Sequence, residues 1–306
     1  MCKTASCCGQ TRRRSASRPR SPPLAGKSSE ASLAAAERAL LARLPPPWRS
    51  GRLEPLASGL TNCNYRLRLP SGRSHFLRQG HPDPVRLGID RATEWQLYQG
   101  PWAGTGLALP SQRSRHWPDA AGLVRRAELA GGAAPAALQP GLLAGVLTRL
   151  HRLPVPSVVM AVRAHSAGYR ARLARVSAWL PALERGLLAS REPADCWLPC
   201  HHDLNPANLL GSRPWVIDWE YGAAGHPGFE VASIQRTHNW QDAQREALEQ
   251  SYCERAVGPV GPRGFQSRAF LPWVDYIGLL WALLMAEQQP GPDYQALIDL
   301  NRQRLE

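Results

Sequence analysis

The sequence predicts an α+β protein with two lobes, a small one built on an antiparallel sheet and a larger one that is mainly helical. Three short segments between residues 52 and 79 have the residue pattern of strands. Glycine and proline then interrupt the chain near residues 128–136, where we place the boundary between the lobes. Beyond this break, most periodic segments have the apolar spacing of a helix. With 306 residues, the chain is long enough for a sizeable core.

The smaller lobe is expected to span residues 31–130. Its elements, in chain order, are a helix (31–44), three strands (52–57, 64–69 and 74–79), a second helix (88–99) and a fourth strand (122–129). The first helix ends because the prolines that begin at Pro45 cannot continue it. The strand over 64–69 alternates polar and apolar residues, and Gly72 favours a hairpin turn after it. Asp90 is the expected N-cap of the second helix.

The larger lobe is expected to span residues 131–306. Its helices are predicted at 138–153, 165–190, 241–256, from 270 onward and at 293–305. A short β-rich insertion interrupts these helices in the middle of the lobe. Because clefts between lobes are favoured ligand sites, we expect the functional site where the two lobes meet. The sequence indicates no oligomeric state.

The net charge of +13 is concentrated at the N-terminus. Residues 1–29 contain seven basic residues and no acidic ones, in a segment that lacks the apolar residues to fold. We therefore expect a disordered basic tail over residues 1–30. A nucleic-acid-binding module would rest on this tail alone, so no nucleic-acid partner is expected. No apolar segment follows the arginines as in an export signal, and we expect a cytoplasmic protein with reduced cysteines.

A membrane span and a zinc site are also not expected. The apolar segment 270–286 carries Asp275, and a carboxylate costs about 2.5–3.5 kcal/mol at the centre of a bilayer. A core helix is therefore predicted there, and no membrane partner. Residue types that bind zinc cluster at Cys196, Cys200, His201 and His202. Their spacing matches no common zinc site.

The segment from Cys200 to Glu220, CHHDLNPANLLGSRPWVIDWE, contains the residues that point to chemistry. A loop with the spacing H-x-D-x-x-x-x-N precedes a short apolar strand, and the strand ends at Asp218. A hairpin-like return would bring Asp203, Asn208 and Asp218 to one place. Phosphoryl transfer needs such a set, a carboxylate to orient the attacking hydroxyl and oxygen ligands for Mg²⁺. The alternative is that these residues only form turns, in which Asp and Asn are common.

This segment resembles the signature of the aminoglycoside phosphotransferase and choline kinase-like superfamily, whose members are relatives of protein kinases. Further segments resemble the same superfamily in chain order: LASGLTNCNYRLRL, HFLRQGHPDP, GIDRATEWQLY and LAGVLTRLHRLP. The resemblance covers roughly residues 50–290 and is nearest to choline, ethanolamine and thiamine kinases. It implies a protein kinase-like fold, ATP and Mg²⁺ as cofactors, and a small-molecule alcohol as the partner that is phosphorylated.

The resemblance also implies roles for residues of the central segment. Asp203 is expected to be the catalytic base, and His201 is expected to structure its loop. Asn208 and Asp218 are expected to bind the metal. Family members often have Asp where this chain has Glu230, so we interpret Glu230 as a helix-start residue and assign it no part in catalysis.

On the nucleotide side, the resemblance places a loop over the ATP phosphates. The residues expected there are Ser58, Gly59, Thr61 and Asn62. Arg78 would take the position that lysine holds in protein kinases and would pair with Glu94. Arginine suits this position because its planar, permanently charged fork binds phosphate through two hydrogen bonds.

Aromatic and acidic residues of the larger lobe are the candidates for binding the acceptor. Aromatic faces backed by acids hold quaternary or heteroaromatic cations, which favours a choline- or thiamine-type acceptor. The candidate residues are Trp219, Glu220, Trp273 and Trp281, with Tyr276, Asp275 and Glu287 nearby in sequence. Alternatively, the tryptophans pack the core, Glu220 helps to hold a second metal ion, and the acceptor is an aminoglycoside or another small alcohol or sugar. A catalytically silent kinase-like binding protein would be expected to lose Asp203, Asn208 or Asp218, and none is lost.

Overall fold

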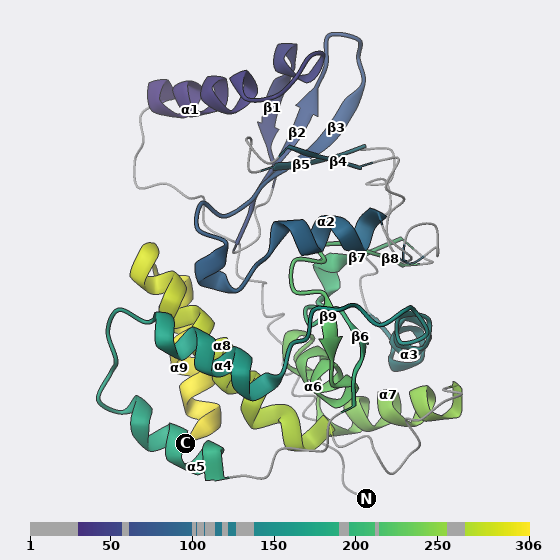
Figure 1. Cartoon of the computed structure of the whole chain (residues 1–306), viewed down its shortest axis with the longest axis vertical. Coiled ribbons are helices and arrows are strands. Elements are labelled where there is room, and N and C mark those ends of the chain that lie inside the picture. The colour runs from purple at the N-terminus through teal and green to yellow at the C-terminus, as the bar shows by residue number, and fades with distance from the viewer. Residues whose placement is uncertain are drawn as a thin grey trace, which may run out of the picture.

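The computed structural model describes residues 30–56, 61–99, 102, 107, 114–117, 122–126, 138–189, 196–211, 214–255 and 267–306. Figure 1 shows a small lobe with a sheet above a larger lobe of helices. The predicted two-lobed α+β architecture is confirmed. The predicted tail, residues 1–30, lies almost entirely outside the described residues.

The small lobe is built on a five-stranded antiparallel sheet in the order β1-β2-β3-β5-β4. Its strands are β1 (Arg52–Pro55), β2 (Cys63–Arg68), β3 (Ser74–Gln79), β4 (Ser114–Trp117) and β5 (Gly122–Arg126). The register of β2 and β3 sets Asn64 opposite Arg78. Gly72 closes their hairpin with a φ of 79°, a conformation that glycine adopts without strain. β4 was not predicted, because its four residues lack a strand pattern.

Helix α1 (Glu30–Ala42) packs on one face of this sheet. The apolar residues that meet there are Leu40, Leu44, Leu53, Leu67 and Leu77. The other face of β3 carries Arg78, because successive side chains of a strand point to opposite faces. Because Leu77 points into the leucine core, the side chain of Arg78 points to the opposite face of the sheet.

Helix α2 (Arg91–Gln99) lies between the two lobes (Figure 1). It follows a 3-10 turn, Val85–Leu87. Asp90 accepts a hydrogen bond from the backbone N–H of Ala92 at 2.9 Å, which confirms the predicted N-cap. The helix thus brings its first residues close to both lobes.

The large lobe holds seven described helices. They are α3 (Pro140–Leu150), α4 (Val162–Arg172), α5 (Leu180–Ala189), α6 (Pro227–Thr237), α7 (Asp242–Arg255), α8 (Ser267–Gln288) and α9 (Pro292–Leu305). The prediction of one long helix over 165–190 is wrong. The chain is extended at Leu173, and Pro181 starts a new helix that it could not have continued. Glu287 accepts the backbone N–H groups of Ala174 and Arg175, which the break leaves without helical partners.

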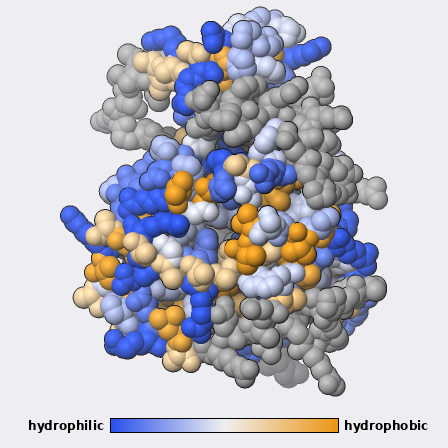
Figure 2. Space-filling model, viewed as in Figure 1, coloured by the Kyte–Doolittle hydropathy of each residue, from blue (hydrophilic) through white to orange (hydrophobic). Residues whose placement is uncertain are grey.

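Helix α8 is, among the described helices, the one long and apolar enough to cross a membrane, with a mean hydropathy of 1.6. Half of the most apolar stretch of α8 is buried inside the protein. The helix packs against α4, α6 and α9, as the predicted core helix would. On the face shown in Figure 2, hydrophilic residues are interspersed with apolar ones over the helical lobe.

The β-rich insertion consists of two short ladders inside the large lobe. β6 (Leu198–Cys200) pairs with β9 (Ala223–Gly225), and β7 (Leu209–Leu210) pairs with β8 (Trp215–Val216). Because both ladders are antiparallel, the chain leaves β6, forms a loop over 201–208 and returns to Asp218 beside it. Leu209 and Val216 are fully buried and anchor this return in the core.

Candidate active site

The loop that follows β6 is held in place by His201, which is fully buried. Its Nε2 donates to the carbonyl of Ile217 at 2.9 Å, and its Nδ1 accepts the backbone N–H of Asp203 at 3.2 Å. One imidazole therefore connects the loop to the residue just before Asp218. This is the structuring position that the sequence predicts for His201.

The carboxylate of Asp203 is surrounded by amide donors. Asn205 donates to its two oxygens at 3.0 and 3.1 Å, and Asn208 donates to Oδ2 at 2.9 Å. Burial and the nearby charge of Asp218 raise the pKa of Asp203 to about 7, against the effect of the amide hydrogen bonds. A base with a pKa near the working pH is well suited to take a proton from a hydroxyl. Asn205 was not recognised from the sequence, although its place before Pro206 is typical of a cap.

Asn208 and Asp218 lie together and offer oxygen ligands. The N–H of Ile217 donates to the carbonyl of Asn208 at 3.0 Å, which places Asn208 beside the residue that precedes Asp218. Asn208 uses its amide nitrogen toward Asp203, so its amide oxygen points elsewhere. Asp218 has a φ of 67°, an uncommon conformation that Asp tolerates better than most residues. A carboxylate and an amide oxygen are ligands that fit Mg²⁺.

Arg78 reaches this group from the small lobe. Its guanidinium pairs with Asp218 through Nη1 and with Glu94 of α2 through Nη2. Although burial opposes ionisation, the carboxylates of Glu94, Asp218 and Glu220 raise the pKa of Arg78 above its usual range. The predicted pair of Arg78 with Glu94 is present, and a permanent positive charge lies beside the expected phosphate position.

Asn62 and Glu220 also meet at the junction of the lobes. Asn62 donates to Glu220 Oε2 at 2.9 Å, and both are buried. Burial and the charge of Asp218 raise the pKa of Glu220. Arg91, at the first position of α2, contacts both residues. Of the other residues expected over the phosphates, Thr61 lies just before Asn62, whereas Ser58 and Gly59 lie outside the described residues.

Glu230 of α6 lies on the other side of the loop. Its carboxylate accepts the backbone N–H groups of His201 and His202, each at 2.9 Å. Burial opposes ionisation, but the electrostatic influence of His151 and the other surrounding histidines lowers the pKa of Glu230 to about 2. Glu230 therefore fixes the loop backbone as an anion, a positioning role that was not foreseen from the sequence.

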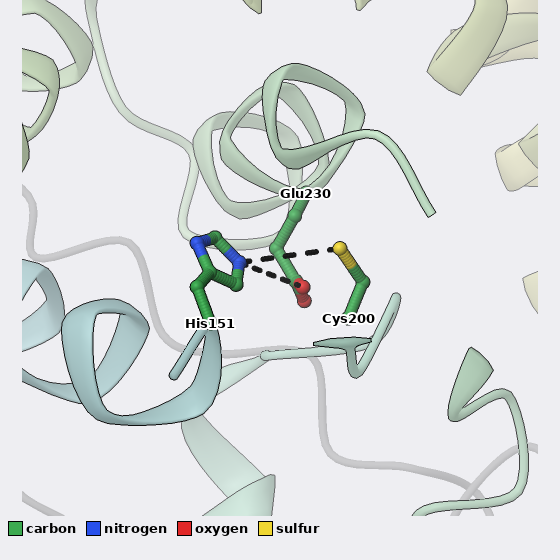
Figure 3. A group of neighbouring side chains, drawn as sticks. All are labelled: His151, Cys200 and Glu230. Atoms are coloured by element: carbon green, nitrogen blue, oxygen red, sulfur yellow. Dashed lines mark hydrogen bonds and ion pairs between the residues drawn. The ribbon is translucent and has the colours of Figure 1, made fainter. Parts of the chain in front are cut away.

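Figure 3 shows the cluster of His151, Cys200 and Glu230 under the loop. The Nε2 of His151 lies 3.9 Å from Cys200 Sγ and 3.9 Å from Glu230 Oε2. Among the described residues, this is the His, Cys and acid group close enough to hold a metal ion. Burial and the charge of Glu230 raise the pKa of Cys200 well above its usual value. With both oxygens of Glu230 committed to the loop, we interpret the cluster as a hydrogen-bonded support.

His201 and His202, two of the four residues of zinc-binding type that cluster in the sequence, both bind the backbone. His201 uses both ring nitrogens on the loop and on Ile217. His202 uses Nδ1 on the carbonyl of Tyr221 at 2.9 Å. The two imidazoles thus hold separate stretches of backbone.

The tryptophans expected at the acceptor site are mostly in the core. Trp219 is 1% exposed, and its Nε1 donates to the carbonyl of Val216. Trp273 is also 1% exposed, with the guanidinium of Arg163 5.0 Å from its ring centre. These two rings match the alternative in which tryptophans pack the core, and we leave them out of the proposed acceptor site. Trp281 is half-buried and packs edge-on against Tyr294.

The acidic residues near these tryptophans are paired inside the protein. Arg236 binds Asp275 through two hydrogen bonds at 2.6 and 2.9 Å. Glu287 pairs with Arg86. Asp275 and Glu287 are therefore counter-ions of arginines, Arg236 in α6 and Arg86 in the 3-10 turn before α2.

Comparisons with known proteins agree with this geometry. A model of the phosphotransferase enzyme family matches residues 52–270. Protein LicA of Haemophilus influenzae is 36% identical over 59 residues, which span 19% of this chain and only 22% of LicA.

Three solved structures illustrate the similarity of fold. A choline/ethanolamine kinase family protein from Mesorhizobium loti has a TM-score of 0.64 and 23% identity, over 89% of this chain and 93% of that one. Choline kinase LicA from Streptococcus pneumoniae has a TM-score of 0.69 and 17% identity, over 89% and 96%. A structure of LicA in complex with AMP has a TM-score of 0.66 and 15% identity, over 89% and 97%.

Proposed function

The chain belongs to the phosphotransferase enzyme family, and we propose that it is an ATP- and Mg²⁺-dependent kinase for a choline- or thiamine-type alcohol. The family match confirms the prediction of an enzyme, a small-molecule kinase. One observation carries the proposal beyond the family. Asp203, Asn208 and Asp218 meet on one loop and its return strand, directly beside the guanidinium of Arg78.

In the proposed reaction, the hydroxyl oxygen of the acceptor attacks the γ-phosphorus, and the bond from that phosphorus to the ADP oxygen breaks. Asp203 takes the hydroxyl proton, while Asn205 and Asn208 hold its carboxylate in one orientation. Arg78 binds the phosphates through its guanidinium. A Mg²⁺ ion held by Asn208 and Asp218 would supply further positive charge beside the phosphates.

The support for ATP comes from the nucleotide side of the site. The side chain of Arg78, from β3, contacts Asp218, and the side chain of Asn62, just before β2, contacts Glu220. The phosphates would lie beside these contacts. The fold is shared with LicA, of which a complex with AMP is known. Phosphoryl transfer from ATP accounts for both observations, since the phosphates would then lie beside Arg78 and beside the Mg²⁺ that Asp218 would hold.

The support for a choline-type acceptor is the similarity in fold to proteins described as choline and choline/ethanolamine kinases. Within this chain, Trp281 remains partly exposed and can offer an aromatic edge or face. Glu220 is less suited to meet a cationic acceptor, because its carboxylate already binds Arg91 and Asn62. Aminoglycosides and other small alcohols remain as competing acceptors in the test.

An acceptor screen tests the proposal. ADP release from Mg-ATP would be followed with choline, ethanolamine, thiamine and several aminoglycosides, and the product would be identified by phosphorus NMR. We expect turnover with choline or thiamine that Asp203→Asn abolishes, whereas Asp299→Asn, a matched change at an exposed aspartate of α9, leaves it intact. Turnover with an aminoglycoside alone would replace the proposed acceptor. Failure to bind nucleotide would contradict the kinase itself.

A further inference from the structure

Arg91 begins helix α2, where an arginine is unfavourable for the helix itself. The positive end of the helix dipole lies at this terminus, and a cation there typically costs about 0.3–1 kcal/mol. Its intrahelical pair with Glu94 also has the base on the N-terminal side, which is the less favourable order. Arg91 therefore does not stabilise α2. Its favourable contacts lie outside the helix.

The guanidinium of Arg91 closes a ring of hydrogen bonds at the junction of the lobes. Its Nη1 donates to Glu220 Oε2 at 2.8 Å, and its Nη2 donates to Asn62 Oδ1 at 2.8 Å. The ring is completed by Asn62 Nδ2, which donates to the same oxygen of Glu220 at 2.9 Å. Nη1 also donates to Glu94 Oε2 at 2.8 Å. Asn62 is 5% and Glu220 7% exposed, so these bonds are largely shielded from water.

The ring joins three segments that serve the nucleotide. Asn62 lies at the end of the loop expected over the phosphates, directly before β2. Glu220 lies two residues after Asp218, the expected metal ligand. Glu94 holds Arg78 through its other oxygen. A single side chain on α2 thus contacts the loop of the small lobe, the metal segment of the large lobe and the partner of Arg78.

We propose that Arg91 is a positioning residue that fixes Asn62 against Glu220 and so sets the nucleotide affinity of the site. This inference rests on the proposed function. Arginine suits the role because its rigid, planar fork holds donors on two separate nitrogens, whereas the three donors of lysine's ammonium share one nitrogen. Without Arg91, Glu220 would be a buried carboxylate with Arg78 as its remaining guanidinium, 4.0 Å away. Arg78 would then be drawn from Asp218 toward Glu220.

The test is the affinity of the metal-free protein for ADP, measured by titration calorimetry in EDTA. We expect Arg91→Gln and Asn62→Ala each to weaken binding about tenfold, which corresponds to about 1.4 kcal/mol. The double variant should bind within about twofold of either single variant, because both changes open the same ring. In steady-state assays, KM for ATP should rise by a similar factor while kcat changes less than about threefold. Arg91→Lys should recover part of the affinity.

Arg170→Gln is the matched control, because Arg170 forms a comparable ion pair with Glu184 away from the site. The side chains of Arg170 and Arg91 are 27% and 19% exposed. Unchanged ADP binding in this control is expected. Wild-type affinity in Arg91→Gln, or additive losses in the double variant, would overturn the inference. If Arg91→Gln does not fold, Arg91→Met takes its place, because it removes both donors to the ring and keeps an unbranched side chain. Absence of ADP binding in the wild type, both in EDTA and with Mg²⁺ added, would overturn the proposed function as well.

Discussion

Asp203 of the loop and Glu230 of α6, which binds the loop backbone, have pKa values shifted in opposite directions. Asp203 receives hydrogen bonds from the neutral amides of Asn205 and Asn208, and Asp218 lies near it. Glu230 receives backbone N–H groups of the loop and lies among imidazoles. The pKa is about 7 for Asp203 and about 2 for Glu230. Burial alone would raise both, so the neighbouring charges and donors decide which carboxyl can exchange a proton.

The largest effect should come from Asp203→Asn, which removes the proton acceptor. A positioned general base contributes about 10²–10⁴-fold, so we expect kcat to fall by roughly 10³-fold. Stability should fall less than in Glu230→Gln, because the loss of a carboxylate whose ionised form is disfavoured by burial offsets the amide donor left without an acceptor. Stopped-time ADP assays and denaturant unfolding measure the two quantities. A variant that keeps more than a tenth of wild-type kcat would show that Asp203 is not the base.

A smaller effect, on stability rather than chemistry, is expected for Glu230→Gln. One oxygen becomes an NH₂ group and faces a backbone N–H of the loop, which leaves a buried donor without an acceptor. The expected loss is about 1–3 kcal/mol in the free energy of unfolding. Activity per folded molecule should fall much less than in Asp203→Asn. Glu230→Asp keeps the charge and is the control. Equal stability of Glu230→Gln and wild type would contradict a positioning role.

The two carboxyls should also give opposite slopes of stability against pH in the metal-free protein. Asp203 has a folded pKa of about 7 against a usual 3.8, so the folded state binds the extra proton and stability falls as pH rises through this window. Glu230 has a folded pKa of about 2 against 4.5, so its stabilisation is present above about pH 4.5 and is lost only in acid.

Unfolding in denaturant at several values between pH 5 and 8 checks these slopes. The stability of Asp203→Asn relative to wild type should increase with pH up to about 7. The stability lost in Glu230→Gln should stay constant over the same range. The reverse pattern would show that the two environments have been assigned the wrong way round.

The smallest effect is expected for Cys200→Ala, which tests whether the cluster under the loop is a support or a metal site. If the cluster is a support, Cys200→Ala removes one buried sulfur and lowers the free energy of unfolding by about 1 kcal/mol. Metal analysis of the purified wild type should find no stoichiometric zinc. Stoichiometric zinc that disappears in Cys200→Ala would identify a metal site instead.

The sequence predicted best what depends on local pattern. The strands around Asn64 and Arg78, the cap at Asp90 and the loop-strand order from His201 to Asp218 follow from alternation, capping and spacing. The break at Leu173 was missed because the apolar period continues through it, and only the position of Pro181 signals a new start.

What the sequence could not give depends on contacts between distant segments. Glu230 lies 28 residues after His202, and Glu220 lies 158 residues after Asn62, so neither contact has a local signature. Arg91 reads as an ordinary helix residue until Asn62 and Glu220 are placed beside it. Trp273 illustrates the opposite limit, because helical spacing alone does not separate a core aromatic residue from a ligand-binding one.

The most direct test of the opposite tuning is a carbon NMR titration of the metal-free protein with labelled Asp and Glu carboxyl groups. Asp203→Asn and Glu230→Gln would assign the two signals by their disappearance. The account predicts that Asp203 titrates near pH 7 and that Glu230 stays ionised to the lowest pH at which the protein is folded. An Asp203 that titrates near its usual 3.8, or a Glu230 that titrates at or above 4.5, would contradict it.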